Sequence, residues 1–169
     1  MIRLYGERVS RARAGVKKTM SGNKYEVALD ETWELFGQYM SGAHAGLCCA
    51  ISSEPLSEAA ETALDSSLAA LGYGREACTY IVSADLDPQA LFVPIEGLDP
   101  ICIVAADGKS AALLGQAYHL AVPPGKATRL LGRTAVSFLD FESLLKTPQD
   151  KQIAWALLKK LPKFGEKRG

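Results

Sequence analysis

The stretch Ile101-Cys102-Ile103-Val104-Ala105 carries the clearest structural signal in this sequence. A continuous run of five apolar residues is typical of a strand that is buried on both faces of a parallel sheet. The polar sequence Asp107-Gly108-Lys109-Ser110 comes shortly after it and predicts a turn into a short helix over residues 111–114, which Gly115 ends. A buried strand that leads directly into a helix is the building unit of an α/β protein.

The same pattern recurs on both sides of this stretch. Short apolar runs predict further strands, and apolar residues spaced three and four apart predict helices. We expect Asp30 and Ser53 to cap the first two helices, Gly72 to end the second, and a loop rich in Asp and Pro to lead from residue 83 to residues 91–94. The predicted strands are residues 47–51, 79–82, 101–105 and 135–139, and the predicted helices are residues 30–40, 56–71, 111–114 and 148–161.

Strands that alternate with helices predict a three-layer α/β/α fold around a central, mostly parallel four-stranded sheet. At 169 residues the chain suits one domain. We assign residues 30–162 to this domain, residues 1–29 to a basic N-terminal arm or loop, and residues 163–169 to a basic C-terminal tail. Ligands bind such sheets at the carboxyl ends of the strands. A site is therefore expected in the loops at residues 52–56, 83–88, 106–110 and 140–143.

Charge is unevenly distributed along the chain, although the formal net charge is zero. Basic side chains gather in the first 18 and the last 11 residues, so an acidic body carries two basic ends. Such ends favour binding to phosphate backbones or to an acidic partner, and the alternative is that they are solvated tails that keep the protein soluble. The candidate nucleic-acid-binding residues are Arg3, Arg8, Arg11, Arg13, Lys17, Lys18 and Lys109.

The four cysteines, Cys48, Cys49, Cys78 and Cys102, all lie in apolar, strand-like stretches. No C-x-x-C pair is present, which disfavours a zinc site or a disulfide framework, and we predict that these thiols are core residues. No apolar run approaches the roughly 18 residues that a membrane span needs, and no secretory signal is visible. A cytoplasmic location without membrane association is the default expectation.

Two further motifs are weak. Gly108-Lys109-Ser110 follows a strand as in a phosphate-binding P-loop, but Ile103 stands where that motif needs its first glycine. Lys109, at the start of a helix, is left as a group that could meet one anion. His44 and His119 are isolated in the sequence, which favours surface or structural roles. We therefore predict no metal site and no cofactor.

Residues 44–161 resemble the uracil-DNA glycosylase superfamily, especially its bacterial and archaeal iron–sulfur members. The stretch from Asp99-Pro100-Ile101 to Leu113-Leu114-Gly115 is similar to the strand-to-helix stretch of that family, commonly written P-x-V-I-x-A-L-G-x-x-A-x-x-x-L-L-G. Residues 144–161, with Pro148, Lys151 and Trp155, are similar to its closing helix, L-L-x-x-P…K…W…L. The resemblance implies the three-layer fold of that family.

The motifs that carry the chemistry of the family are not retained. Ser52-Ser53-Glu54-Pro55-Leu56 stands where the family has G-E-A-P-G, and Ser83 replaces the asparagine that recognises the base. Asp140-Phe141-Glu142 replaces the His-Pro-Ser loop whose histidine stabilises the leaving uracil anion, and a carboxylate there would repel that anion. Cysteines at the spacing of the iron–sulfur cluster are absent from the sequence. The degenerate positions are Ser53, Glu54, Ser83, Asp140, Phe141 and Glu142.

The resemblance therefore implies a catalytically inactive glycosylase-like protein that acts in DNA replication or repair as a nucleic-acid-associated binding or scaffold protein. Its expected partners are DNA, bound through the basic ends, and replication or repair proteins. The alternative is a diverged DNA glycosylase or other hydrolase with a carboxylate as general base and an aromatic ring stacked on a flipped base. The candidate bases are Glu54, Asp85, Asp140 and Glu142, and the candidate rings are Phe141 and Tyr118. Another three-layer α/β fold also stays open, because one sequence does not fix the strand order.

Overall fold

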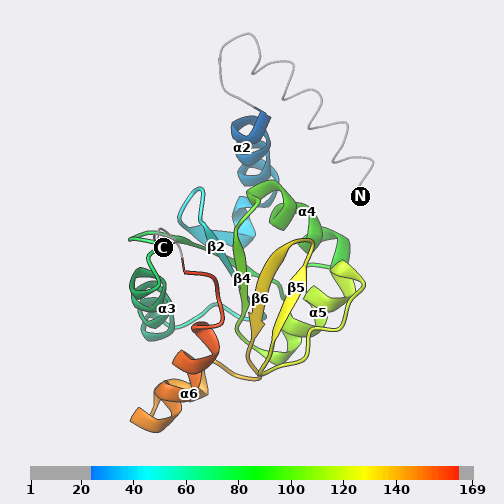
Figure 1. The fold of residues 1–169 in the computed structure, drawn as a ribbon. Coiled ribbons are helices and arrows are strands. Elements are labelled where there is room, and N and C mark those ends of the chain that lie inside the picture. Colours follow the sequence, from blue (N-terminus) through cyan, green and yellow to red (C-terminus); the bar gives the residue numbers. More distant parts are fainter. Residues whose placement is uncertain (1–23, 164–169) are drawn as a thin grey trace.

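A mixed β-sheet of six strands forms the centre of the molecule in the computed structural model, which describes residues 24–163 (Figure 1). The strands are β1 (Met40–Gly42), β2 (Cys48–Ser52), β3 (Cys78–Val82), β4 (Cys102–Ala105), β5 (Ala127–Leu130) and β6 (Arg133–Ser137). Their order across the sheet is β1-β3-β2-β4-β6-β5. The inner four strands are parallel to one another, and β1 and β5 are antiparallel edges.

The α/β class is thus confirmed, and the predicted number of strands is wrong. The four predicted strands are the four inner ones, whose apolar runs are buried on both faces. The two edge strands are short and only partly buried, so they lack a strong apolar pattern. Strand β5 joins β6 through Leu131-Gly132, where both residues have positive φ, as a two-residue hairpin turn of type I′ requires.

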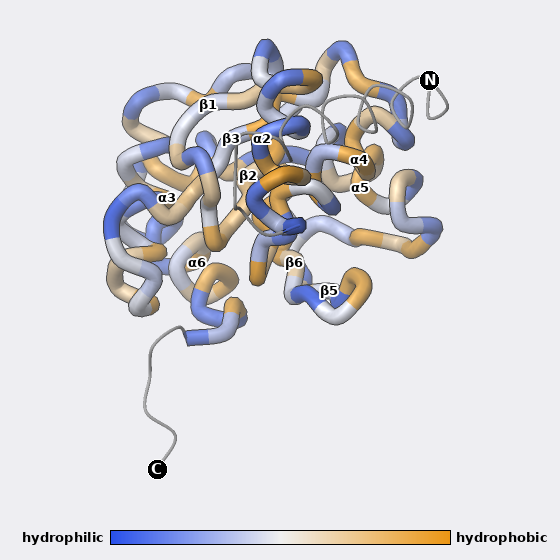
Figure 2. The backbone as a smooth tube through the Cα atoms, turned by 90° about the horizontal axis from the view of Figure 1, so that it is seen from above, coloured by the Kyte–Doolittle hydropathy of each residue, from blue (hydrophilic) through white to orange (hydrophobic). Residues whose placement is uncertain are grey.

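Helices cover both faces of the sheet (Figure 2). Helices α3 and α6 pack on one face, and α2, α4 and α5 pack on the other. Neighbouring strand residues point to opposite faces, so that Cys48 and Ala50 contact the first layer while Cys49 and Ile51 contact the second. The helices are α2 (Lys24–Phe36), α3 (Glu58–Ala70), α4 (Pro88–Leu98), α5 (Gly108–Tyr118) and α6 (Pro148–Leu158), and two 3₁₀ turns are η1 (Gly37–Tyr39) and η2 (Glu142–Leu145).

Helix α4 is not predicted from the sequence, and its first residues occupy the end of the predicted loop that begins at residue 83. Its N-cap is Asp87, whose side chain accepts a hydrogen bond from the backbone N–H of Ala90 at 2.7 Å. Pro88 stands at the first helical position, where a missing N–H has no cost. Pro94 lies inside the helix and is buried, so packing against the sheet outweighs its poor helix propensity.

Helix boundaries also differ from the predicted ones. Helix α2 begins at Lys24, so residues 24–29 belong to a helix and Asp30 is not its N-cap. The N-cap of α3 is Ser57 and not Ser53, because the Ser57 side chain accepts the backbone N–H of Ala60. A single sequence does not distinguish these serines, since both precede an apolar stripe.

The two predicted glycine stops have opposite outcomes. Gly72 follows α3 with φ +94°, and the backbone N–H of Tyr73 closes the helix end on the carbonyl oxygen of Leu68, as predicted. Gly115 lies inside α5, which continues to Tyr118 and ends at His119. A side chain at Gly115 would collide with the carbonyl oxygen of Leu120, so this glycine permits close packing of the following loop and does not end the helix.

All four cysteines are buried in β2, β3 and β4, which confirms their prediction as core residues. Burial raises the pKa of the Cys49 thiol well above its ordinary value, so this side chain is a neutral, apolar group in the core. Between residues 24 and 163, no helix combines the length and the apolar character that a membrane crossing requires.

Candidate functional site

The four inner strands end at the same edge of the sheet, because they are parallel. Ser53, Ser83 and Asp107 follow the ends of β2, β3 and β4, and Asp140 comes shortly after β6. The structure therefore brings the four predicted loops to one edge. In the sheet, β3 lies on one side of β2 and β4 lies on the other. The chain therefore runs from β2 to β3 in one direction and then crosses to β4 in the opposite direction, which places the topological switch point between β2 and β4.

Asp107 is the centre of the polar contacts at this switch point. The backbone N–H and the side-chain hydroxyl of Ser53 both donate to Asp107 Oδ2 at 2.9 Å. The backbone N–H of Ser110 donates to Asp107 Oδ1 at 2.8 Å, which makes Asp107 the N-cap of α5. Burial acts to raise the pKa of Asp107, but the hydrogen bonds from Ser110 and Ser53 outweigh it and hold that pKa below its usual value. Asp107 is thus an ionised acceptor whose two oxygens both have protein partners.

Ser83 stands where the glycosylase resemblance places the base-recognising asparagine. Its side chain is 5% exposed, and its hydroxyl and backbone N–H both donate to the carbonyl oxygen of Ser52, at 3.2 and 2.8 Å. This serine ties the end of β3 to the end of β2 and presents no polar group to a ligand.

Glu142 fixes the start of α3. Both of its carboxylate oxygens accept from Ser57, one from the backbone N–H at 3.1 Å and one from the hydroxyl. A carboxylate next to the first turn of a helix is also favoured by the helix dipole. Asp140 stabilises its own turn, since the hydroxyl of Ser143 donates to the carbonyl oxygen of Asp140 at 2.8 Å.

The two candidate stacking rings are far apart in the fold. Phe141 is 1% exposed and packs edge-on against Phe138 with ring centroids 5.0 Å apart, so it offers no ring face to a base. Tyr118 is the last residue of α5 and lies near the start of β6, at the amino ends of the inner strands. There its hydroxyl donates to Glu96, which also pairs with the buried Arg133. Burial and that hydrogen bond raise the pKa of Tyr118.

The remaining polar candidates do not assemble into a catalytic set. Glu54 and Asp85 are exposed, and within residues 24–163 neither makes a hydrogen bond or ion pair with another side chain. His44 is exposed and stacks on Trp33, while His119 is exposed at the end of α5. Over the same described range, no three His, Cys, Asp or Glu side chains are placed to hold a metal ion.

Of the predicted nucleic-acid-binding residues, the structure places only one. Lys109 is exposed in the first turn of α5, at the carboxyl edge of the sheet. The other six lie outside the described residues, as does the C-terminal segment from residue 164 onward. They are Arg3, Arg8, Arg11, Arg13, Lys17 and Lys18.

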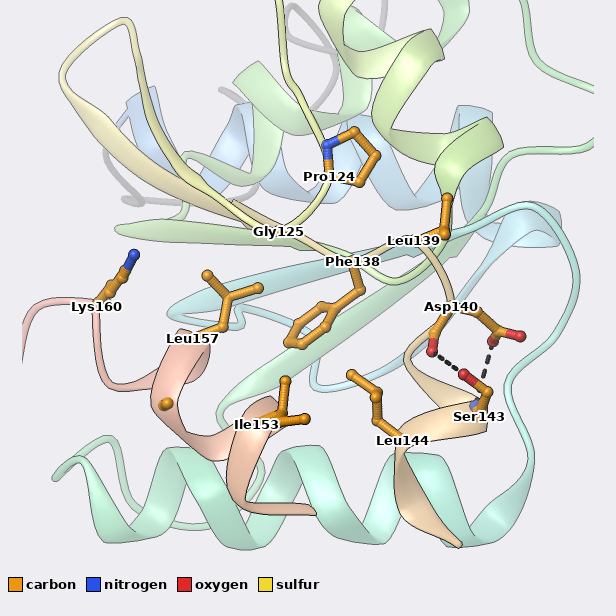
Figure 3. A pocket seen from close by; sticks show the side chains of 11 residues that line it. Pro124, Gly125, Phe138, Leu139, Asp140, Ser143, Leu144, Ile153, Leu157 and Lys160 are labelled. Carbon is orange, nitrogen blue, oxygen red and sulfur yellow. Dashed lines mark hydrogen bonds between the residues drawn. The ribbon is translucent and has the colours of Figure 1, made fainter. Parts of the chain in front are cut away.

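An apolar groove with a volume of about 530 Å³ lies beside the end of β6 (Figure 3). Leu139 and Ile153 line it and are 74% and 58% exposed, which is unusual for large apolar side chains. Asp140 and Ser143 lie at one end of the groove and Lys160 at the other. The full lining comprises Pro124, Gly125, Phe138, Leu139, Asp140, Ser143, Leu144, Ile153, Ala156, Leu157 and Lys160.

The sequence analysis does not find this groove. It places Leu139 in the fourth predicted strand and Ile153 in the last predicted helix. Leu139 instead lies beyond the end of β6, and Ile153 lies in α6 but is exposed. Strand β6 ends at Ser137, and the packing of α6 turns Ile153 outward. Of the four loops predicted to form a site, the loop at residues 140–143 is the one that borders the groove. No protein-family model matches this chain, and no curated protein matches its sequence.

Proposed function

We propose that this protein is a catalytically inactive member of the uracil-DNA glycosylase fold group that acts as a nucleic-acid-associated binding or scaffold protein in DNA replication or repair. The observation that carries the proposal is the use of polar groups at the carboxyl edge of the sheet. Ser53, Asp107 and Glu142 hold one another, or the starts of helices, in place. Ser53 and Glu142, two of the positions where the resemblance expects catalytic motifs, therefore have structural contacts.

Uracil excision requires a group that stabilises the leaving base anion. At the corresponding position this chain has Asp140 and Glu142, and Glu142 is held as an acceptor by Ser57. A negative group near a developing anion raises the barrier, and the loss of one electrostatic or acid–base group typically slows a reaction by about 10²–10⁴-fold. With several such groups replaced, the expected rate is at background.

The fold supports the same proposal. Four parallel strands between two helical layers bring the loops after β2, β3, β4 and β6 to one edge, as the family resemblance requires. The exposed, apolar groove at this edge supports a binding role. The basic residues 3–18 supply the proposed contact to nucleic acid.

The enzymatic part is tested by incubating the full chain with a single-stranded oligonucleotide that contains uracil, followed by alkaline cleavage at abasic sites. We expect no more product than in buffer alone. Product that disappears in Asp140→Ala, or in Glu54→Ala, would instead establish a diverged glycosylase that uses carboxylates at the strand ends.

The binding part is tested by fluorescence anisotropy of the same oligonucleotide over a series of salt concentrations. About four phosphate contacts would give a slope of roughly −3 for log K against log salt, unchanged when thymine replaces uracil. Replacing Arg8, Arg11 and Arg13 with alanine is expected to flatten that slope, and the matched triple variant Lys126→Ala, Lys146→Ala, Lys151→Ala is expected to leave it unchanged. If the wild type does not bind at low salt, the protein does not associate directly with nucleic acid.

A further inference from the structure

The helical layer formed by α3 and α6 does not extend over the edge strand β5. On the opposite face, α2, α4 and α5 pack over the strands. On the α3 and α6 face, Ala127 and Arg129 of β5 are exposed, and they lie in register with Val136 and Thr134 of β6. The groove beside α6 is the inner part of this uncovered strip. One more helix beside α6, at the usual interaxial distance of about 8–10 Å, would complete the layer.

The side chains of the groove have the chemistry of a helix–helix contact. Leu144, Ile153 and Leu157 form its apolar wall, and Phe138 lies at its floor (Figure 3). Neighbouring helices bury side chains of this kind against each other, and an apolar face that remains exposed marks a binding surface. The uncovered strip continues past the groove onto β5, so the surface is wider than a small-molecule pocket.

The charges at the two ends of the groove are opposite. Asp140 and Ser143 lie at the end near the start of α6, and Lys160 lies at the end near its finish. A helix carries partial positive charge at its N-terminus and partial negative charge at its C-terminus. A helix that runs parallel to α6 would therefore place its N-terminus at Asp140 and its C-terminus at Lys160, with both ends in favourable contact.

We infer that the groove beside β6 and α6 binds an amphipathic helix of a partner protein, oriented parallel to α6, with basic residues in its first turn and acidic residues in its last. This inference rests on the proposed binding role and names the kind of protein partner. It does not involve residues 1–18, so the peptide and DNA experiments have independent outcomes.

The test uses a displayed library of peptides about 15 residues long, with apolar residues at helical spacing and random residues in the first and last turns. The library is selected on the full chain and counter-selected on Leu139→Glu. Enriched peptides are expected to carry basic first turns and acidic last turns. Their affinity is expected to fall about tenfold or more in Leu139→Glu and in Ile153→Glu. Leu131→Glu changes a leucine that is 68% exposed outside the groove, and it is expected to bind as the wild type does.

A variant with reversed charges at the two ends of the groove tests the predicted charge order of the peptide. In a chain that combines Asp140→Lys with Lys160→Glu, selection is expected to yield peptides with the opposite charge order, and circular dichroism checks that the fold is kept. If no peptide is enriched on the wild type over Leu139→Glu, the inference is wrong. The same holds if the enriched peptides show no charge order. A dimer in light scattering that Leu139→Glu dissociates would also overturn it, since the groove would then bind a second copy of this chain.

Discussion

Between β2 and β4, a carboxylate at the carboxyl edge of the sheet has protein donors on both oxygens, whereas beside β6 two large apolar side chains at the same edge face solvent. Asp107 binds Ser53 and Ser110 in the first region. Leu139 and Ile153 are mostly exposed in the second. The switch point of a parallel sheet is the usual ligand site, yet here its polar side chains bind one another.

The difference separates stability from binding in this protein. A buried or half-buried polar group is stabilising only when it has partners, and the groups at the switch point have them. Exposed apolar side chains add little to the stability of the isolated chain but release water when a partner covers them. Changes at the switch point should therefore lower the free energy of unfolding, and changes of the two exposed groove side chains, Leu139 and Ile153, should not.

The largest effect is expected from Phe141→Ala, because Phe141 lies between the two regions. Its ring is 1% exposed against Phe138, and its backbone N–H donates to the carbonyl oxygen of Ala106 at 2.8 Å. Removing the ring should lower the free energy of unfolding by about 3–5 kcal/mol, measured by urea denaturation. Leu131→Ala, at an exposed turn, is the control and should change it by less than about 0.5 kcal/mol. A loss below about 1 kcal/mol for Phe141→Ala would show that this loop is not packed as described.

A smaller loss of about 2 kcal/mol is expected from Asp107→Ala. The change removes the N-cap of α5 and leaves the backbone N–H of Ser53 without its acceptor. Asp107→Asn keeps one acceptor oxygen and should lose less. Equal losses for the two variants, measured by thermal and urea unfolding, would mean that the hydrogen bonds of Asp107 do not stabilise the switch point.

The pH dependence of unfolding tests the charge of Asp107 directly. Its pKa in the folded protein is below the value of about 3.9 that an aspartate has in an unfolded chain. Its contribution to stability is therefore complete above pH 4 and is lost as the pH falls through the folded pKa. The difference in unfolding free energy between wild type and Asp107→Asn should shrink below about pH 4. A difference that stays constant from pH 6 to pH 2 would rule out an ionised Asp107.

The smallest effect is expected from the two exposed side chains of the groove. Leu139→Ser and Ile153→Ser should each change the free energy of unfolding by no more than about 0.5 kcal/mol, because both side chains already face solvent. Leu157→Ala, which removes a leucine only 8% exposed on the same helix as Ile153, should cost about 2–5 kcal/mol in the same assay. Losses above 1 kcal/mol for both serine variants would mean that the groove is closed in solution.

Much of the central sheet was predictable because the signal is local. A strand buried on both faces needs a mostly apolar run, and such runs predict strands at residues 47–51, 79–82, 101–105 and 135–139, although the last strand ends at Ser137. Cys48, Cys49 and Cys102 belong to these runs, and Cys78 directly precedes the second, so the cysteines are buried for the same reason. Gly72 ends α3 because the left-handed conformation favours glycine wherever the rest of the chain lies.

The edges and the long-range contacts were not predictable in this way. Strands β1 and β5 exist because a neighbouring strand supplies hydrogen bonds, and α4 forms despite Pro94 because its apolar face is buried on the sheet. The partner of Asp107 is 54 positions away in the sequence. A pattern of neighbouring residues contains no information on such a pair.

The sequence by itself determined the α/β class, the four inner strands and the core role of the cysteines. Only the tertiary structure decided the strand order, the use of Ser53, Asp107 and Glu142 as structural anchors, and the exposure of Leu139 and Ile153. Burial on both sides of a strand is encoded in consecutive residues. Whether a polar group has a hydrogen-bond partner, or an apolar side chain is buried, depends on which distant segments the fold brings beside it.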